Sequence, residues 1–169
     1  MSERRAILPG SFDPLTRGHS DIIRRSLNIF DSVIVAVLSN PSKGTLFSLD
    51  ERLAMIKEEF VDLKSRVEVT SFSGLLVDFA HSSGVKVVVR GLRAISDYDY
   101  EAQLALVNKS LYEDLETLFL TAREANTYVS SSLVRQIASF GGAVDKLVTP
   151  TVKQALEKKF VTGYNYRNK

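Results

Sequence analysis

Short apolar runs rich in β-branched residues alternate with segments of helical period along almost the whole chain. In the run 32–38, apolar residues stand at consecutive positions rather than at every second one. That pattern is typical of strands covered on both faces, as in a parallel sheet. We therefore predict five buried strands, at 6–8, 32–38, 67–70, 85–89 and 117–120.

The segments between these strands carry apolar residues at helical spacing. Ser48 and Glu51 form a capping-box pattern ahead of an apolar series at 53, 56 and 60. Gly84 and the pair at 141–142 are typical helix-ending residues, and Pro150 suits the first turn of a last helix. We predict helices near 22–30, 48–60, 75–80, 104–111, 133–140 and 150–160.

This alternation predicts a single α/β domain of the doubly wound, Rossmann-like class, with a five-stranded parallel sheet and helices on both faces. We assign it to residues 1–161, because 162–169 are polar and aromatic without periodicity and form a tail. In open α/β sheets, ligands bind beyond the carboxyl ends of the strands, near the point where the strand order reverses. The loops expected to hold a site are 9–17, 39–47, 71–74, 90–100 and 122–131.

The composition narrows the chemistry that these loops can hold. Zero cysteines among 169 residues exclude disulfides, thiolate metal sites and cysteine nucleophiles, and the two histidines leave little for a His-rich metal site. Lys and Arg number 22 against 20 Asp and Glu, so the charge balance indicates neither a nucleic-acid nor a membrane partner. The start of the sequence lacks a secretory pattern, and no apolar run approaches the ~20 residues of a membrane span, so we expect a cytoplasmic protein.

The loop after the first strand carries the strongest candidate chemistry. Gly10 permits close approach of the backbone to a ligand, and Ser11 presents a hydroxyl and an N–H at the strand's carboxyl end. Gly18 and His19 stand at the start of the next helix, where free N–H groups and the helix dipole attract phosphate. A histidine there can donate to phosphate oxygens whose charge grows in a transition state. The alternative is a capping loop in which His19 only packs.

Three further loops offer positive charge or hydroxyl groups. Lys43 follows the second strand, and its ammonium suits a polyphosphate. Arg90 and Arg93 flank a short turn after the fourth strand, an arrangement suited to bidentate phosphate contacts. The serines at 130–132 run into an amphipathic helix, as an N-cap or as phosphate donors, with Arg135 nearby. Taken singly, each of these is more readily explained as a solvated or capping side chain.

Asp97, Asp99 and Glu101 follow the two arginines at alternate positions. They have the residue types of a metal cluster, but acidic residues also enrich the first turn of a helix. We favour the helix-start interpretation for Asp97 and Asp99, and assign no residue as a metal ligand.

Taken together, these loops resemble the bacterial phosphopantetheine adenylyltransferases, a family of the nucleotidyltransferase superfamily that carries the T/H-x-G-H signature. The signature is present at 16–19 within the longer stretch G-S-F-D-P-L-T-R-G-H. The family's N-P-x-K, R-G-L-R-A-x-x-D-x-x-Y-E and serine-rich motifs are matched at 40–43, 90–101 and 129–135. Two departures are small: Ser11 stands where other members carry threonine, and Asn126 where an aromatic residue is often found.

The resemblance implies reversible transfer of an adenylyl group from ATP to 4′-phosphopantetheine, which gives dephospho-CoA and pyrophosphate. It implies Mg²⁺ as a cofactor, a homohexamer, CoA as a feedback ligand, and catalytic contacts from Ser11, His19 and Lys43. The acceptor site implied comprises Ser11, Lys43, Leu76 and Arg90, although Leu76 fits a core position equally well. The ATP site implied comprises Ser11, Phe12, His19, Gly91, Leu92, Arg93, Glu101, Asn126, Thr127, Tyr128, Val129, Ser130, Ser131 and Ser132.

Two alternatives stay open on the sequence. A sibling enzyme that acts on nicotinate mononucleotide or glycerol phosphate shares the Gly-His signature and the same α-phosphate chemistry, but the 90–94 and 130–135 segments argue against it. A non-catalytic nucleotide sensor on the same fold is the other alternative. The presence of His19, Lys43 and both arginines counts against a sensor.

Overall fold

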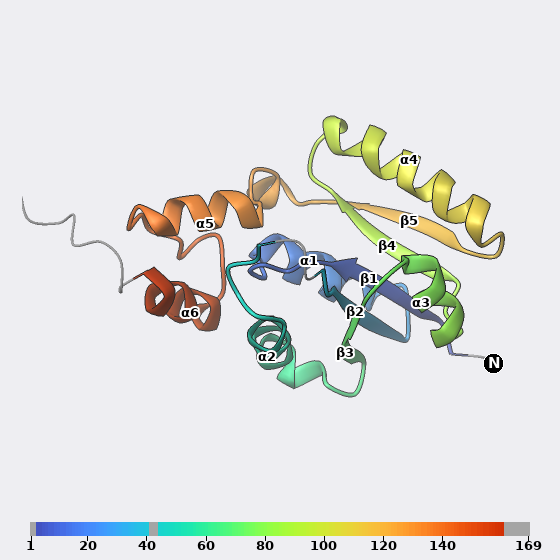
Figure 1. The fold of residues 1–169 in the computed structure, drawn as a ribbon, viewed down its shortest axis with the longest axis horizontal. Helices are drawn as coiled ribbons and strands as arrows, with labels where there is room; N and C mark the ends of the chain where they lie inside the picture. The colour runs from blue at the N-terminus through green and yellow to red at the C-terminus, as the bar shows by residue number, and fades with distance from the viewer. Residues whose placement is uncertain (1–2, 41–43, 161–169) are drawn as a thin grey trace, which may run out of the picture.

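The computed structural model describes residues 3–40 and 44–160 of the chain. In that part, five parallel strands form one sheet in the order β3-β2-β1-β4-β5, with helices packed around it (Figure 1). The predicted α/β class with a five-stranded parallel sheet is confirmed. The predicted tail, 162–169, lies outside the described residues and stays a prediction.

The five predicted strands are all present, and all except the strand at 32–38 end later than the side-chain pattern indicated. Gly10 still pairs with Val37, and Gly91 with Leu120, because backbone hydrogen bonding continues where the apolar pattern stops. The strands are β1 (Arg5–Gly10), β2 (Ser32–Leu38), β3 (Val67–Phe72), β4 (Val87–Leu92) and β5 (Glu116–Thr121).

The helices begin and end largely on the signals found in the sequence. Ser48 Oγ accepts the Glu51 N–H at 3.2 Å, and the Glu51 carboxylate accepts the Ser48 N–H at 2.8 Å, which completes the predicted capping box. Gly84 follows its helix with φ +66°, the left-handed conformation that favours glycine. The helices are α1 (Arg17–Ser26), α2 (Leu49–Glu59), α3 (Leu76–Ser83), α4 (Ile95–Leu111), α5 (Ser131–Ser139) and α6 (Pro150–Phe160), with 3₁₀ turns η1 (Val61–Leu63) and η2 (Glu124–Asn126).

The predicted start of α4 at 104 was wrong, because the helix begins at Ile95 inside the segment expected to be a loop. Its first turns expose Ile95, Tyr98 and Tyr100, so no apolar stripe faces the core there. The Asp97 carboxylate accepts the Arg93 N–H at 3.0 Å, a contact that closes the turn into the helix. The connection between β4 and α4 is therefore only two residues long, 93–94.

The sheet separates two apolar clusters because successive strand residues point to opposite faces. Leu8 and Val35 pack with residues of α1 and α2, whereas Ile7 and Ile34 pack with residues of α3. In Figure 1, α5 and α6 lie past the carboxyl ends of the strands. No helix within 3–40 and 44–160 is long and apolar enough to cross a bilayer.

The strand order reverses between β1 and β4, and these two strands are joined less extensively than the others. A single register pair, Ile7 opposite Val88, links them, whereas β1 pairs with β2 along its whole length. Their carboxyl ends are thus free of mutual backbone pairing, at the position where doubly wound sheets bind ligands.

Candidate active site

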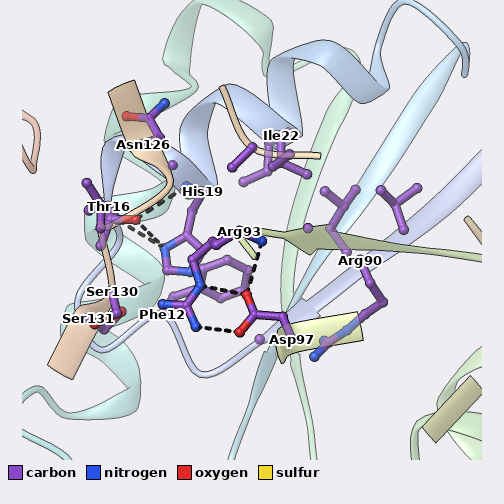
Figure 2. A pocket seen from close by; sticks show the side chains of 18 of the residues that line it. Phe12, Thr16, His19, Ile22, Arg90, Arg93, Asp97, Asn126, Ser130 and Ser131 are labelled. Atoms are coloured by element: carbon purple, nitrogen blue, oxygen red, sulfur yellow. Dashed lines mark hydrogen bonds and ion pairs between the residues drawn. The ribbon is translucent and has the colours of Figure 1, made fainter. Parts of the chain in front are cut away.

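The carboxyl ends of β1 and β4 border a cavity of about 460 Å³. Its walls come from the loop after β1, the start of α1, the end of β4, the first turns of α4 and the residues around the start of α5 (Figure 2). Segments 9–19, 90–101 and 122–131 of the sequence therefore meet in one pocket at the point where the strand order reverses.

Most of the site residues named from the sequence lie on this pocket. The exceptions have different locations: Leu76 packs against the apolar cluster on the opposite face of the sheet, and Lys43 lies outside the described residues. Leu92, Thr127, Tyr128 and Ser132 neighbour lining residues in the sequence without lining the pocket themselves. The named residues that line it are Ser11, Phe12, His19, Arg90, Gly91, Arg93, Glu101, Asn126, Val129, Ser130 and Ser131.

His19 is fixed by the N-terminal cap of its own helix. Thr16 Oγ1 accepts the His19 N–H at 3.3 Å, and Nδ1 of His19 accepts the Thr16 N–H at 3.0 Å (Figure 2). This is a capping box in which histidine takes the place of the usual Glu or Gln. Because Nδ1 accepts from a backbone donor, the neutral imidazole carries its proton on Nε2.

The surroundings of His19 favour the uncharged ring. Burial, followed by the positive charges of Arg93 and Arg90, lowers the pKa of His19 from 6.5 to about 4. The Phe12 ring packs edge-on against the imidazole at a centroid distance of 5.1 Å. At neutral pH the site therefore holds a neutral Nε2–H donor in a fixed orientation.

The state of His19 can be checked by NMR titration of the free protein. We expect the His19 ring to stay neutral until the pH falls towards 4, because its pKa is lowered to about 4. The chain has two histidines, so a His81→Asn background leaves one imidazole signal to follow. Titration of that signal near the ordinary value of 6.5 would contradict the environment described here.

Arg90 joins β4 to β1 and to α4. Its guanidinium makes a bidentate ion pair with Glu101, with both N···O distances 2.7 Å, and donates to the Pro9 carbonyl at 2.9 Å. A guanidinium carries more N–H groups than these three contacts use, so Arg90 retains donors for a ligand. The carboxylate of Glu101 thus orients Arg90.

Arg93 is held in a similar way by Asp97. Arg93 Nε and Nη2 lie 3.0 and 3.2 Å from the Asp97 carboxylate oxygens (Figure 2). Burial acts to raise the pKa of Asp97, but the hydrogen bonds from Arg93 outweigh it and the pKa is lowered. Asp97 is therefore ionised at neutral pH, and its charge is matched by the arginine beside it.

Asp13 is a structural residue of the site that the sequence did not reveal. Its carboxylate is 3% exposed and accepts the N–H groups of Leu46 and Phe47, each at 2.9 Å. Arg135 lies 3.3 Å from the same carboxylate and also donates to the Asp13 carbonyl. The sequence suggested phosphate as the partner of Arg135, whereas the structure pairs it with Asp13. An aspartate in a polar loop gives no sequence signal of such burial.

Phe12 has an unusual backbone that glycine makes possible. Its φ of +47° is rare for a residue with a side chain, yet Phe12 is only 4% exposed. A Cβ on Gly10 would lie 3.0 Å from the Phe12 ring, so the glycine leaves the space that the ring occupies. The loop is thereby turned back over the end of β1, which places Ser11 and Phe12 on the pocket.

Comparisons with known proteins show the family to which the chain belongs. Residues 7–137 match the family model described as cytidylyltransferase-like. The chain is 52% identical over 160 residues to a phosphopantetheine adenylyltransferase of Geotalea daltonii, covering 95% of this chain and 99% of that protein. It is 51% identical to the protein of the same name from Thermotoga neapolitana, with coverage of 94% and 98%.

A solved structure resembles the fold at much lower sequence identity. The Plasmodium falciparum nicotinic acid mononucleotide adenylyltransferase complexed with NaAD superposes with a TM-score of 0.68 at 16% identity, covering 93% of this chain and 96% of that one. At that identity the likeness shows a shared fold alone.

Proposed function

This chain belongs to the phosphopantetheine adenylyltransferases, within the cytidylyltransferase-like family, and on that premise we propose how its pocket performs the reaction. The reaction is the reversible transfer of an adenylyl group from ATP to 4′-phosphopantetheine, which yields dephospho-CoA and pyrophosphate. It is a nucleotidyltransferase step of coenzyme A biosynthesis. The observation that carries the proposal is the meeting of His19, Arg90 and Arg93 in one cavity at the strand ends.

The chemistry needs positioning and charge stabilisation more than a strong base. The acceptor's phosphate is anionic at neutral pH and attacks the α-phosphorus in line, while pyrophosphate leaves on the opposite side. In this proposal the Nε2–H of His19 donates to an α-phosphate oxygen whose negative charge grows during the step. The hydroxyl of Ser11 and the ammonium of Lys43 contribute further contacts to the reacting phosphates.

Two helix N-termini support the binding of the nucleotide. α1 begins at the pocket with Thr16 as its N-cap, and α5 begins there with Ser130, whose Oγ accepts the Leu133 N–H at 3.1 Å. Helix N-termini attract anions through their free N–H groups and their dipoles. The triphosphate would therefore lie between the starts of these two helices, with Arg90 kept for the phosphate of the acceptor.

The carboxylates of the pocket do not suit a metal ion held by the protein. Asp97 is paired with Arg93, and Glu101 with Arg90, so neither carboxylate is available without breaking an ion pair. Within residues 3–40 and 44–160, no group of three or more His, Asp or Glu side chains is placed to hold a metal. We propose that Mg²⁺ binds the polyphosphate of ATP instead, where it would offset negative charge.

The direct test is release of pyrophosphate from ATP and Mg²⁺ with one acceptor at a time. We expect release with 4′-phosphopantetheine, and only background with nicotinate mononucleotide, with glycerol 3-phosphate or without an acceptor. Turnover with nicotinate mononucleotide instead would assign the chain to a sibling activity. Nucleotide binding with no turnover on any acceptor would indicate a sensor.

Removal of Arg90 tests the acceptor side of the pocket. We expect Arg90→Ala to raise KM for 4′-phosphopantetheine by about 10- to 100-fold, since a hydrogen bond to a charged group contributes ~1.5–3 kcal/mol. The dissociation constant for ATP, measured by calorimetry, is expected to stay within about threefold. Arg5→Ala, which breaks an ion pair with Glu68 at the start of β1, is the matched control. Equal acceptor KM values for the two variants would argue against the contact.

We further propose a homohexamer that acts in the cytoplasm and is inhibited by CoA. The support for assembly is the apolar exposure of α4, where Ile95 and Leu106 are 89% and 71% exposed. The support for inhibition is chemical, because CoA contains both the adenine nucleotide and the phosphopantetheine parts that the pocket binds. Light scattering gives the oligomeric state, and a CoA titration of the forward reaction gives the inhibition.

A further inference from the structure

A buried arginine beneath the first loop has no assigned part in the reaction. Arg52 lies in the second turn of α2 and is 3% exposed. An arginine is almost never fully buried unless its charge is paired. In the described part of the chain, no carboxylate lies within ion-pair distance of its guanidinium, in contrast to Arg90 and Arg93.

The partners of Arg52 are carbonyl oxygens from three separate segments. Nη1 donates to the Ser11 carbonyl at 2.7 Å and to the Leu38 carbonyl at 3.2 Å. Nε lies 3.4 Å from the carbonyl of Ser48, the N-cap of its own helix. One planar group thus connects the loop after β1, the end of β2 and the start of α2.

The shortest of these contacts reaches a residue of the pocket. Ser11 lines the cavity beside His19, and its carbonyl is the acceptor in the 2.7 Å hydrogen bond. Holding the carbonyl fixes the peptide plane on which the next N–H lies and limits the rotation of Ser11. The adjoining Phe12 adopts φ +47°, so the loop needs such an external tie to keep its shape.

We propose that Arg52 is a positioning residue for adenylyl transfer, which sets the place of Ser11 by holding its carbonyl while its own unpaired charge lies beneath the phosphate-binding loop. The inference rests on the proposed function. Displacements of about 1 Å in a catalytic arrangement can cost about 10²-fold in rate without a change in the residues that touch the substrate. Loss of Arg52 therefore acts on turnover more than on binding.

A control with the same kind of partners, although at an exposed position, lies at the other end of the sheet. Arg66 precedes β3 and, like Arg52, donates to three carbonyl oxygens, those of Leu27, Phe30 and Asp31, at 2.7, 3.0 and 2.8 Å. Arg52→Met and Arg66→Met make the same chemical change, removing a guanidinium that connects backbone segments. Only the first change lies under the pocket.

The experiment compares kcat, the two KM values and the thermal midpoint for Arg52→Met, Arg52→Lys and Arg66→Met. All assays are run well below the lowest midpoint. We expect kcat to fall about 10²-fold in Arg52→Met with KM for ATP within about threefold, and to recover to within about tenfold of wild type in Arg52→Lys. Arg66→Met is expected to lose stability yet keep kcat within about twofold. Equal kcat values for the two methionine variants would overturn the proposal.

A second measurement does not depend on the acceptor. In amide NMR spectra of the free protein, we expect the Ser11 and Phe12 signals to move in Arg52→Met and to stay in place in Arg66→Met. Should Arg52→Met fail to fold, Arg52→Gln takes its place, because its shorter amide cannot hold the Ser11 and Leu38 carbonyls as the guanidinium does: unshifted loop signals with wild-type kcat would refute the role. A wild-type protein inactive with 4′-phosphopantetheine would refute the proposed function alone, because the spectra still decide the role of Arg52.

Discussion

A His19→Gln enzyme is expected to keep its fold and its affinity for ATP while kcat falls by about 10²- to 10³-fold. Glutamine is a natural partner in a capping box, so its side chain can still accept the Thr16 N–H that Nδ1 accepts now. Its amide N–H is not held in the fixed orientation of the ring, so it does not replace the preorganised Nε2–H donor. The variant therefore separates the capping role of His19 from its proposed contact with the α-phosphate.

His19→Ala serves as the companion variant. It loses both roles, so we expect a similar loss of kcat together with a weaker α1, since loss of a cap costs about 0.5–2 kcal/mol. The measurements are single-turnover rates with ATP and 4′-phosphopantetheine and urea unfolding of each variant. Wild-type turnover in His19→Gln would rule out the proposed role of the imidazole.

The largest loss of stability is expected from Asp13→Ala. The substitution leaves the N–H groups of Leu46 and Phe47 without their acceptor, while Arg135 loses its ion pair but still donates to the carbonyl of residue 13. Each N–H group that is left without its acceptor away from water costs about 1–3 kcal/mol. Urea denaturation followed by circular dichroism measures the difference from wild type.

Two further variants test whether the loss comes from the orphaned partners. Arg135 keeps its hydrogen bond to the residue-13 carbonyl in Asp13→Ala, so we expect Asp13→Ala/Arg135→Met to recover no stability if the two N–H groups carry the loss. Asp31→Ala removes an aspartate that pairs with Arg4 at the surface and is expected to stay close to wild type. If Asp13→Ala were no less stable than Asp31→Ala, the buried network would have no energetic role.

The sequence indicated most of the fold because the strands are covered on both faces. β2 was predicted with both ends correct, since its apolar run has no interruption and is followed by Asn40-Pro41, a pair that ends a strand. The start of α4 was missed because its first turns expose Ile95, Tyr98 and Tyr100 to solvent. Apolar periodicity indicates which face of a helix or strand is buried, so it gives no signal for a helical turn that buries no face.

The candidate site, too, was predicted from the sequence only in part. The residues that line the pocket follow from their positions at strand ends and from the family resemblance. Arg52 and Asp13 did not follow, because their partners are backbone atoms up to 41 and 34 positions away in the chain. A hydrogen bond between a side chain and a distant backbone group produces no recognisable pattern in the amino-acid sequence of either segment. Ser131 is a similar case, with its hydroxyl donating to the Pro14 carbonyl at 2.8 Å.

The single register pair between β1 and β4 leaves the carboxyl halves of these two strands without backbone pairing to each other. Elsewhere in the sheet a ladder of backbone hydrogen bonds connects neighbouring strands. Past Ile7 and Val88, the side chain of Arg90 connects β4 to β1 through its hydrogen bond to the Pro9 carbonyl. A bound molecule that contacts both strands at once would add a further, reversible link between them. If the substrates bind as proposed, we expect the two halves of the sheet to resist separation more strongly with substrate bound than without it.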